Sequence, residues 1–331
     1  WEGNYLHAMT RVPVDICRKR GEPRVVLGNA GVVRVLAVGE GVTDLRPGQV
    51  AMMHGVARKD RYGYMTHAFA YDAPGTRGLL ATRMVIAADS LIAVPPDSRH
   101  GLAQWAAFSL RYTTAWSNWE LAIGTFRLQV AADLLPAPHV WGWGGGTTLA
   151  ELDLARRHGC RCVMISGDPQ RLARIEAMGL TPLDRRDFAA LTDPAAAPEE
   201  RALAGRRFVA EVMARTAGER VQIFLDYIGT PALDATLQAL GRCGVLATAG
   251  WKRGMDVRLR RAQECVLRRQ HIHTHYASRA QHVAAAAYGE AHGWMPELDA
   301  PITPFAEIPA LARRFAADQA GFFPVFAINP E

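Results

Sequence analysis

Lysine is nearly missing from this chain of 331 residues. Lys19, Lys59 and Lys252 are the lysines, so arginine supplies almost all of the 38 basic residues and the formal charge of +6. Arginine suits planar, bidentate contacts with phosphate and carboxylate groups. The densest basic run, 258–269, contains no aromatic residue, whereas nucleic-acid surfaces combine basic and aromatic side chains. We therefore expect no nucleic-acid partner, and either a phosphate-bearing small molecule or a plain solvated surface accounts for the charge.

The sequence also lacks an apolar run of the ~20 residues that a membrane-spanning helix needs. The first residues contain no apolar core typical of a signal peptide. The five cysteines are odd in number and include no Cys-x-x-Cys pair. Cys160 and Cys162 stand at the start of an apolar run, so we interpret them as small core residues. These absences predict no membrane partner and a reducing, cytoplasmic location.

Glycine is present in quantity, and its densest cluster is 142–146. An apolar strand is predicted at 139–143, just before the turn, and a helix from Thr147 to a stop at Gly159. Such a turn lets the backbone approach a pyrophosphate, and the helix N-terminus offers N–H groups and the positive end of its dipole. The residues expected to hold a dinucleotide are Gly142, Gly144, Gly145, Gly146, Thr147 and Thr148.

The glycine motif is imperfect in two ways. Thr148 stands where a third glycine is expected, and Trp143 within the turn could fill part of the pyrophosphate space. The alternative is an ordinary tight turn in an α/β protein. A second apolar strand at 162–166, which begins a new strand–helix unit, favours the dinucleotide interpretation.

The chain changes character near Leu102, from strands and turns to alternating strands and helices. Strands are predicted at 32–38, 50–53, 139–143, 162–166, 222–228, 244–250 and 322–328, with a pair of strands within 83–94. Helices are predicted at 147–158, 168–178 and 230–240. Asp168 with Pro169 suits a helix start. A polar segment at 184–205 is interpreted as an insertion of surface helix and loop. Repeated strand–helix units with short connections predict a parallel, doubly wound sheet.

These features resemble the medium-chain dehydrogenase/reductase superfamily. The motifs that carry the likeness are 27–33, 38–50, the glycine turn, 225–229 and 241–246. The resemblance implies an α/β protein with two domains. A GroES-like β-rich catalytic domain would span 1–105 and 271–331, and a Rossmann domain 106–270. Within the superfamily the chain looks most like the crotonyl-CoA carboxylase/reductases, through Asn4-Tyr5, 62–67, 184–205 and 273–277.

The resemblance also bears on metal content. Zinc-dependent members carry a Gly-His-Glu motif, and this chain has Gly28-Asn29-Ala30 there. Cys17 alone cannot hold a catalytic zinc, which takes three protein ligands. We therefore expect no metal, which disfavours zinc-assisted alcohol oxidation and favours reduction of the activated C=C bond of an enoyl thioester.

For such a reductase, of class EC 1.3.1, the resemblance implies three candidate catalytic residues. Tyr5 is expected to donate a hydrogen bond to the substrate or to position it, and His275 to act as an acid or to position a carboxylate. Tyr64 falls where that branch carries an aromatic residue. A purely structural role is about as plausible for Tyr5 and His275. Met65 stands where the carboxylating members have a glutamate, so reduction without carboxylation is expected.

The cofactor is expected to be NADPH. Ser166 ends the second strand where NAD enzymes carry an acid, and Arg171 on the next helix could reach a 2′-phosphate. Thr114 matches a family segment near the nicotinamide. The family also implies a homodimer acting on an acyl-thioester substrate. Two alternatives stay open, namely a quinone or enone reductase and a catalytically silent binding protein.

Overall fold

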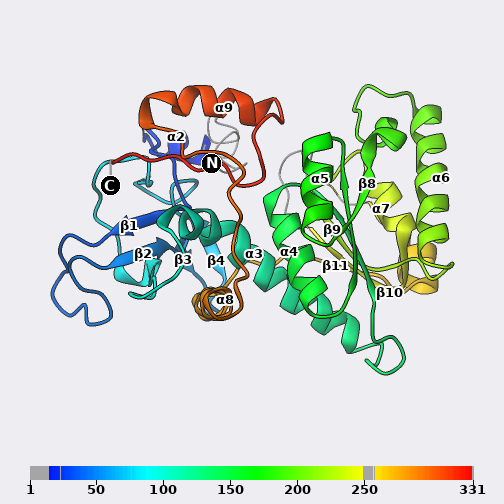
Figure 1. Ribbon diagram of the computed structural model, residues 1–331, viewed down its shortest axis with the longest axis horizontal. Coiled ribbons are helices and arrows are strands. Elements are labelled where there is room, and N and C mark those ends of the chain that lie inside the picture. Colours follow the sequence, from blue (N-terminus) through cyan, green and yellow to red (C-terminus); the bar gives the residue numbers. More distant parts are fainter. Residues whose placement is uncertain (1–14, 23, 76, 249–255, 257, 330–331) are drawn as a thin grey trace. The chain divides into compact units, whose positions relative to one another are not determined.

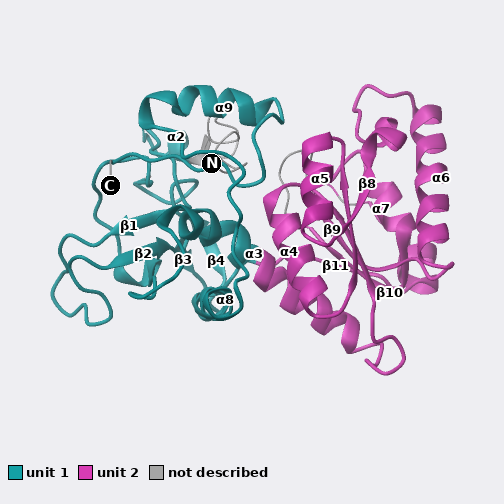
Figure 2. Cartoon of the chain, viewed as in Figure 1, with its two compact units in different colours: residues 1–114, 276–331 teal, residues 115–275 magenta. Residues whose placement is uncertain are grey.

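The computed structural model describes residues 15–22, 24–75, 77–248, 256 and 258–329 (Figure 1). The chain divides into two compact units (Figure 2). Unit 1 comprises 1–114 and 276–331, and unit 2 comprises 115–275. The long helix α3 (Leu102–Arg127) contributes residues to both. The predicted α/β fold class is confirmed, because a parallel sheet and a separate antiparallel region are both present.

Unit 1 is built from short antiparallel strands. One sheet has the order β1-β2-β5 and a second pairs β3 with β4. The strands are β1 (Val32–Arg34), β2 (Val50–Met53), β3 (Val56–Lys59), β4 (Met65–Ala68) and β5 (Leu91–Ala93). Two predicted strands are shortened. The run 32–38 stops at Arg34 and leaves Leu36 exposed, and 83–94 supplies a 3-10 turn (Ala88–Ser90) before β5.

The helices of unit 1 besides α3 are α2 (Asp15–Lys19), α8 (Arg279–His292) and α9 (Ile308–Ala316), with a 3-10 turn at Phe305–Glu307. The strand predicted at 322–328 is wrong. Within that segment a single bridge pairs Phe326 with Thr303, while Phe322 and Phe323 are buried. Pro324 has no N–H to donate, which prevents a regular ladder there.

Unit 2 carries a six-stranded parallel sheet of order β11-β10-β9-β6-β7-β8. The strands are β6 (His139–Trp143), β7 (Arg161–Ser166), β8 (Thr181–Asp184), β9 (Val221–Asp226), β10 (Leu240–Ala247) and β11 (His271–His273). The helices are α4 (Gly146–Arg157), α5 (Pro169–Ala177), α6 (Pro198–Arg215) and α7 (Leu233–Ala239), with a π-helical turn at Arg261–Leu267. This is the doubly wound order of dinucleotide-binding sheets.

Figure 1 shows α4 and α5 on one face of this sheet and α6 and α7 on the other. The predicted strand 139–143 has the bounds of β6, and α4 begins one residue before Thr147. Asp168 caps α5 as predicted, accepting the backbone N–H groups of Gln170 and Arg171 at 2.8 and 3.1 Å. The helix predicted at 230–240 is shorter, because α7 begins at Leu233 and the chain enters β10 at Leu240.

The segment 184–205, predicted as an insertion, forms part of the connection between β8 and β9. It supplies a 3-10 helix (Arg185–Leu191) and the first half of α6. Phe188 and Leu191 are buried in the same hydrophobic cluster as Phe208 of α6. The segment therefore covers one face of the sheet as well as contributing surface.

Candidate functional site

The glycine turn joins the carboxyl end of β6 to the N-terminus of α4. Gly144 has a φ of +154°, a conformation that favours glycine. A Cβ added to Gly145 meets nothing within 4 Å, so open space lies over the turn. No side chain caps α4, and its first turn holds no acidic residue. The first N–H groups of a helix have no partner within it, so this end suits an anionic group.

Thr148 packs beneath the turn rather than over it. Its side chain is fully buried, and its hydroxyl donates to the carbonyl of Trp143 at 3.4 Å. A Cβ on Gly142 would lie 2.7 Å from the Thr148 methyl, and one on Gly144 would overlap the Thr148 hydroxyl. Two of the glycines therefore make room for Thr148, which fills the strand–helix contact where the third glycine was expected.

Trp143 lies in the hydrophobic core. Strand alternation points Trp141 and Trp143 to the α6 face of the sheet and turns Gly142 toward α4. The Trp143 ring stacks on Phe208 with centroids 5.1 Å apart and lies 5.5 Å from Phe224. Trp143 is 1% exposed. The interpretation that Trp143 fills the pyrophosphate space is therefore wrong.

A second set of polar groups lies at the carboxyl ends of β7 and β8. Ser166 ends β7 and is buried, and in the parallel register it pairs with Asp184 of β8. A Cβ on Gly167 would lie 3.2 Å from Nε and 3.3 Å from Nη2 of Arg185, so this guanidinium lies over the glycine. Arg171 lies in the first turn of the adjacent helix α5. Arginines at this strand end suit a 2′-phosphate.

Arg185 was not among the predicted site residues. Its neighbour Arg186 holds the Asp184 carboxylate through side-chain hydrogen bonds of 2.5, 2.9 and 3.0 Å. These contacts lower the pKa of Asp184. The sequence signal for Arg185 was available, because residues that follow adjacent parallel strands meet at one sheet edge. Using it required knowing that β7 and β8 are neighbours.

A buried carboxyl lies beside the glycine turn. Tyr227 follows β9, and its Cβ would be 3.2 Å from a Cβ on Gly144. The Tyr227 hydroxyl donates to Oε2 of Glu151 at 2.6 Å. Glu151 is fully buried on α4, and its Oε1 has no hydrogen-bond partner among the described residues. Burial raises the pKa of Glu151 to about 8, against the lowering effect of Tyr227, so the carboxyl is mostly neutral at pH 7.

With the exception of Thr114, the predicted cofactor-binding residues lie at or just after the carboxyl ends of β6 and β7. The catalytic candidates are distributed differently. Tyr5 lies outside the described residues. Tyr64, before β4, is 45% exposed and lies in unit 1. The cofactor candidate Thr114 is half-buried on α3, also within unit 1. His275 is buried in unit 2, and its carbonyl accepts the Asn118 amide at 3.2 Å. Their catalytic roles stay predictions.

Two further features are absent from the described part of the chain. No three His, Cys, Asp or Glu side chains are placed there to hold a metal ion. No helix within the same residues is long and apolar enough to cross a membrane. Asn29, in the triplet that replaces Gly-His-Glu, is buried.

Comparison with known proteins gives matches by structure alone. No protein-family model matches the sequence, and no curated protein does. An alcohol dehydrogenase from Aeropyrum pernix superposes with a TM-score of 0.77 at 21% identity, covering 100% of this chain and 89% of that one. The 2-octenoyl-CoA carboxylase reductase CinF, solved with NADP and 2-octenoyl-CoA, gives 0.80 at 20% identity, covering 97% and 75%. The crotonyl-CoA carboxylase/reductase AntE, solved with NADP, gives 0.77 at 19% identity, covering 97% and 82%.

These likenesses define the fold. The chain has the two-part architecture of the medium-chain dehydrogenases/reductases, as the sequence resemblance predicted. The matching structures are oxidoreductases. They include carboxylase/reductases, to which the sequence pointed, and also alcohol dehydrogenases, to which it did not.

Proposed function

We propose that the protein is an oxidoreductase that binds a nicotinamide dinucleotide at the glycine turn of unit 2. The observation that carries the proposal is the uncapped N-terminus of α4, open over Gly145. It lies where the strand order reverses, with β6 between β9 and β7, and ligands of doubly wound sheets bind at such points. Oxidoreductases of the same fold that were solved with NADP support it.

We infer that the dinucleotide is NADPH. Its pyrophosphate would accept hydrogen bonds from the first N–H groups of α4, and Arg185 with Arg171 would pair with the 2′-phosphate near Ser166. Ser166 replaces the acid that selects an unphosphorylated ribose, and a serine hydroxyl does not repel phosphate. The residues present fit a phosphate group here, since Gly167 leaves the Arg185 guanidinium room to lie against the backbone.

For the substrate we propose an enoyl thioester, reduced without carboxylation. When bound, the cofactor supplies the hydride. His275 is the proposed proton donor, and Tyr64 and Tyr5 the proposed donors to the thioester oxygen. The support is the sequence likeness to the crotonyl-CoA branch, and Met65 in place of its glutamate disfavours carboxylation. A homodimer and a cytoplasmic location stay predictions.

Two alternatives keep the fold. A quinone or enone reductase would use the same dinucleotide site with a smaller substrate. In the basic run 258–269, Arg260 pairs with Glu264 at 2.9 Å and Arg268 donates to the carbonyl of Leu237 at 3.1 Å, so both arginines make contacts within the protein. One argument for a catalytically silent binding protein was that Trp143 could fill the pyrophosphate space. That argument is removed, because Trp143 is packed in the core.

A substitution at Thr147 tests dinucleotide binding. Thr147 lies in the first turn of α4, where the helix dipole stabilises an acidic side chain. Thr147→Asp should therefore leave folding intact, yet place a negative charge where the pyrophosphate binds and weaken NADPH binding at least about tenfold. Thr147→Asn, neutral and of the same shape, is the matched control. Equal NADPH affinity in both variants, measured by calorimetry, would place the dinucleotide elsewhere.

A second test concerns the 2′-phosphate. Arg185→Ala should weaken NADPH binding roughly tenfold to a hundredfold and leave NADH binding nearly unchanged, because a charge-assisted bond contributes about 1.5–3 kcal/mol. Arg206→Ala, at an exposed position of α6, is the control and should change neither. Parallel loss for both nucleotides would argue against a 2′-phosphate role for Arg185.

The reaction is tested by NADPH oxidation with crotonyl-CoA, with and without bicarbonate. Oxidation independent of bicarbonate is the expected result. Oxidation that requires bicarbonate would indicate that the protein carboxylates its substrate, even though Met65 replaces the glutamate. Tight NADPH binding without thioester turnover would favour the quinone or enone alternative, to be examined with those substrates, and absence of binding would favour the silent protein.

A further inference from the structure

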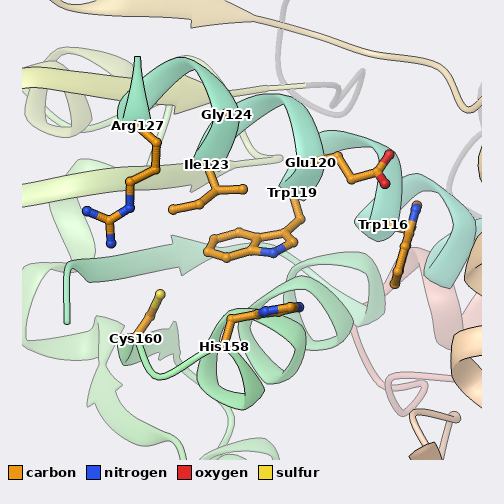
Figure 3. Close-up of a pocket in the computed structure, with 8 residues that line it drawn as sticks. All are labelled: Trp116, Trp119, Glu120, Ile123, Gly124, Arg127, His158 and Cys160. Atoms are coloured by element: carbon orange, nitrogen blue, oxygen red, sulfur yellow. The ribbon is translucent and has the colours of Figure 1, made fainter. Parts of the chain in front are cut away.

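A hollow of about 490 Å³ lies in unit 2, away from the glycine turn (Figure 3). One wall is a stripe of α3 residues at helical spacing, and the other is the loop between α4 and β7. The lining residues are Trp116, Trp119, Glu120, Ile123, Gly124, Arg127, His158 and Cys160. His158 and Cys160 precede β7, so they stand at the amino end of a strand whose carboxyl end carries Ser166. The hollow therefore lies at the amino ends of the strands, whereas the proposed dinucleotide site lies at their carboxyl ends.

The middle of the hollow is planar and apolar. Trp119 is 4% exposed, and its ring lies over His158 with the centroids 6.0 Å apart and the planes 30° from parallel. Ile123 extends the apolar surface along the helix (Figure 3). Cys160 adds a buried thiol whose pKa burial raises to about 11. A protonated, shielded thiol is a poor nucleophile, so this lining suits binding rather than covalent chemistry.

The two ends of the hollow carry opposite charges, with Arg127 at one end and Glu120 at the other (Figure 3). They differ in setting. Arg127 is half-buried, and its Nη1 donates to the carbonyl of Leu135 at 2.9 Å, which holds the guanidinium in place. Glu120 is exposed to solvent. A screened surface charge attracts a ligand weakly, whereas a partly desolvated and positioned arginine attracts an anion more strongly.

Gly124 is the residue of α3 that leaves open space beside the hollow. Glycine inside a helix costs about 1 kcal/mol relative to alanine, so it usually has a packing reason. None is visible here, because a Cβ added to Gly124 meets nothing within 4 Å. The missing side chain is therefore part of the empty volume, and a larger residue would occupy the hollow without displacing a neighbour.

We propose that this hollow is a binding site for a small aromatic carboxylate. The ring lies against Trp119 and Ile123, and the carboxylate pairs with Arg127. The volume is within the range of about 300–1,000 Å³ typical of small-molecule sites. The site is separate from the proposed dinucleotide site, so its occupation does not depend on NADPH.

The experiment is a ¹⁹F NMR titration with 4-(trifluoromethyl)phenylacetate as the probe. Its partner probe, 4-(trifluoromethyl)phenethylamine, has the same ring with a positive charge. The acid should bind saturably and at least about tenfold more tightly than the amine, since tenfold corresponds to the strength of one charge-assisted bond. No saturable binding of the acid, or tighter binding of the amine, would overturn the proposal.

Two variants locate the binding. Gly124→Leu should abolish it while the melting temperature stays at or above that of the parent, because leucine is the better helix former. Arg127→Gln should weaken the acid about tenfold or more and leave the amine unchanged. Leu121→Gln, on the exposed side of the same helix, is the control and should bind as the parent does. Full binding by the Gly124→Leu variant would also overturn the proposal.

Discussion

Lowering the pH from 6.5 toward 4 should destabilise unit 1 by several kcal/mol, because two buried histidines are held in their neutral forms. Nδ1 of His54, after β2, lies 3.0 Å from Nδ1 of His282 on α8. Nε2 of His282 is 3.1 Å from the carbonyl of Ser109 and donates to it, so the His282 Nδ1 accepts from His54. His54 therefore donates to His282. A proton added to Nδ1 of His282 removes the acceptor, and a proton added to His54 places a positive charge in a buried setting.

The sign follows from the pKa values. Burial, with Arg279 adding to it, lowers the pKa of His54 from 6.5 to about 4, and burial lowers that of His282 as well. The unfolded chain therefore binds more protons than the folded one below pH 6.5. The stability is fully present above that value and is lost as the pH falls toward 4. For His54 alone the difference corresponds to about 3 kcal/mol.

The measurement is urea unfolding of the whole chain from pH 7.5 to 4, followed by hydrogen exchange of peptides from unit 1. His54→Asn keeps a donor near the Nδ1 position and cannot titrate, so its stability should depend less on pH. His292→Asn, at the exposed end of α8, is the control and should keep the parent's slope. An unchanged slope in the His54→Asn variant would contradict the prediction.

Unit 2 was largely predictable because its signals are local. The β6 bounds, the Asp168 cap and the glycine turn each depend on residues close together in sequence. Short apolar runs that are bounded by glycine, proline or capping residues predict such elements from the local sequence alone. The strands of unit 1 were overestimated for the opposite reason. A β-branched run becomes a strand only where a partner pairs with it, and β1 has β2 opposite it for three residues only.

The misjudged roles of Trp143 and Thr148 share one physical cause, which is the direction of a side chain relative to the sheet. Trp143 looked like an obstacle because it stands between glycines in the sequence, but strand alternation turns it into the core. Thr148 looked like a lost glycine, but the space that Gly142 and Gly144 leave accommodates it. Arg185 and Tyr227 were missed for another reason, because the groups next to them belong to other strand–helix units of unit 2.

On the alkaline side the large effect should come from unit 2. Burial raises the pKa of Glu151 from 4.5 to about 8, so the folded state keeps a proton that the unfolded chain has released. This contribution to stability is complete below pH 4.5 and is lost as the pH rises through about 8. Above pH 8 the buried charge costs up to about 5 kcal/mol relative to a group that does not titrate.

Glu151→Gln should remove that loss. The amide oxygen still accepts from Tyr227, and the amide N–H group replaces the O–H of the neutral acid, so the variant should match the parent near pH 4.5 and exceed it by several kcal/mol at pH 9. Urea unfolding at both pH values measures the difference, with Glu176→Gln on the exposed side of α5 as the control. An equal alkaline loss in parent and variant would show that Glu151 ionises without cost.

The same substitution links this carboxyl to the proposed dinucleotide site. Tyr227 connects the carboxyl to the glycine turn, because its hydroxyl bonds Glu151 and its Cβ lies close to Gly144. Ionised Glu151 places a negative charge under a turn that is proposed to bind pyrophosphate, and in a buried setting that charge is poorly screened. NADPH affinity should therefore fall above pH 8 in the parent and stay level in the Glu151→Gln variant. A decline of the same size in both proteins would separate the carboxyl from cofactor binding and leave its effect on stability alone.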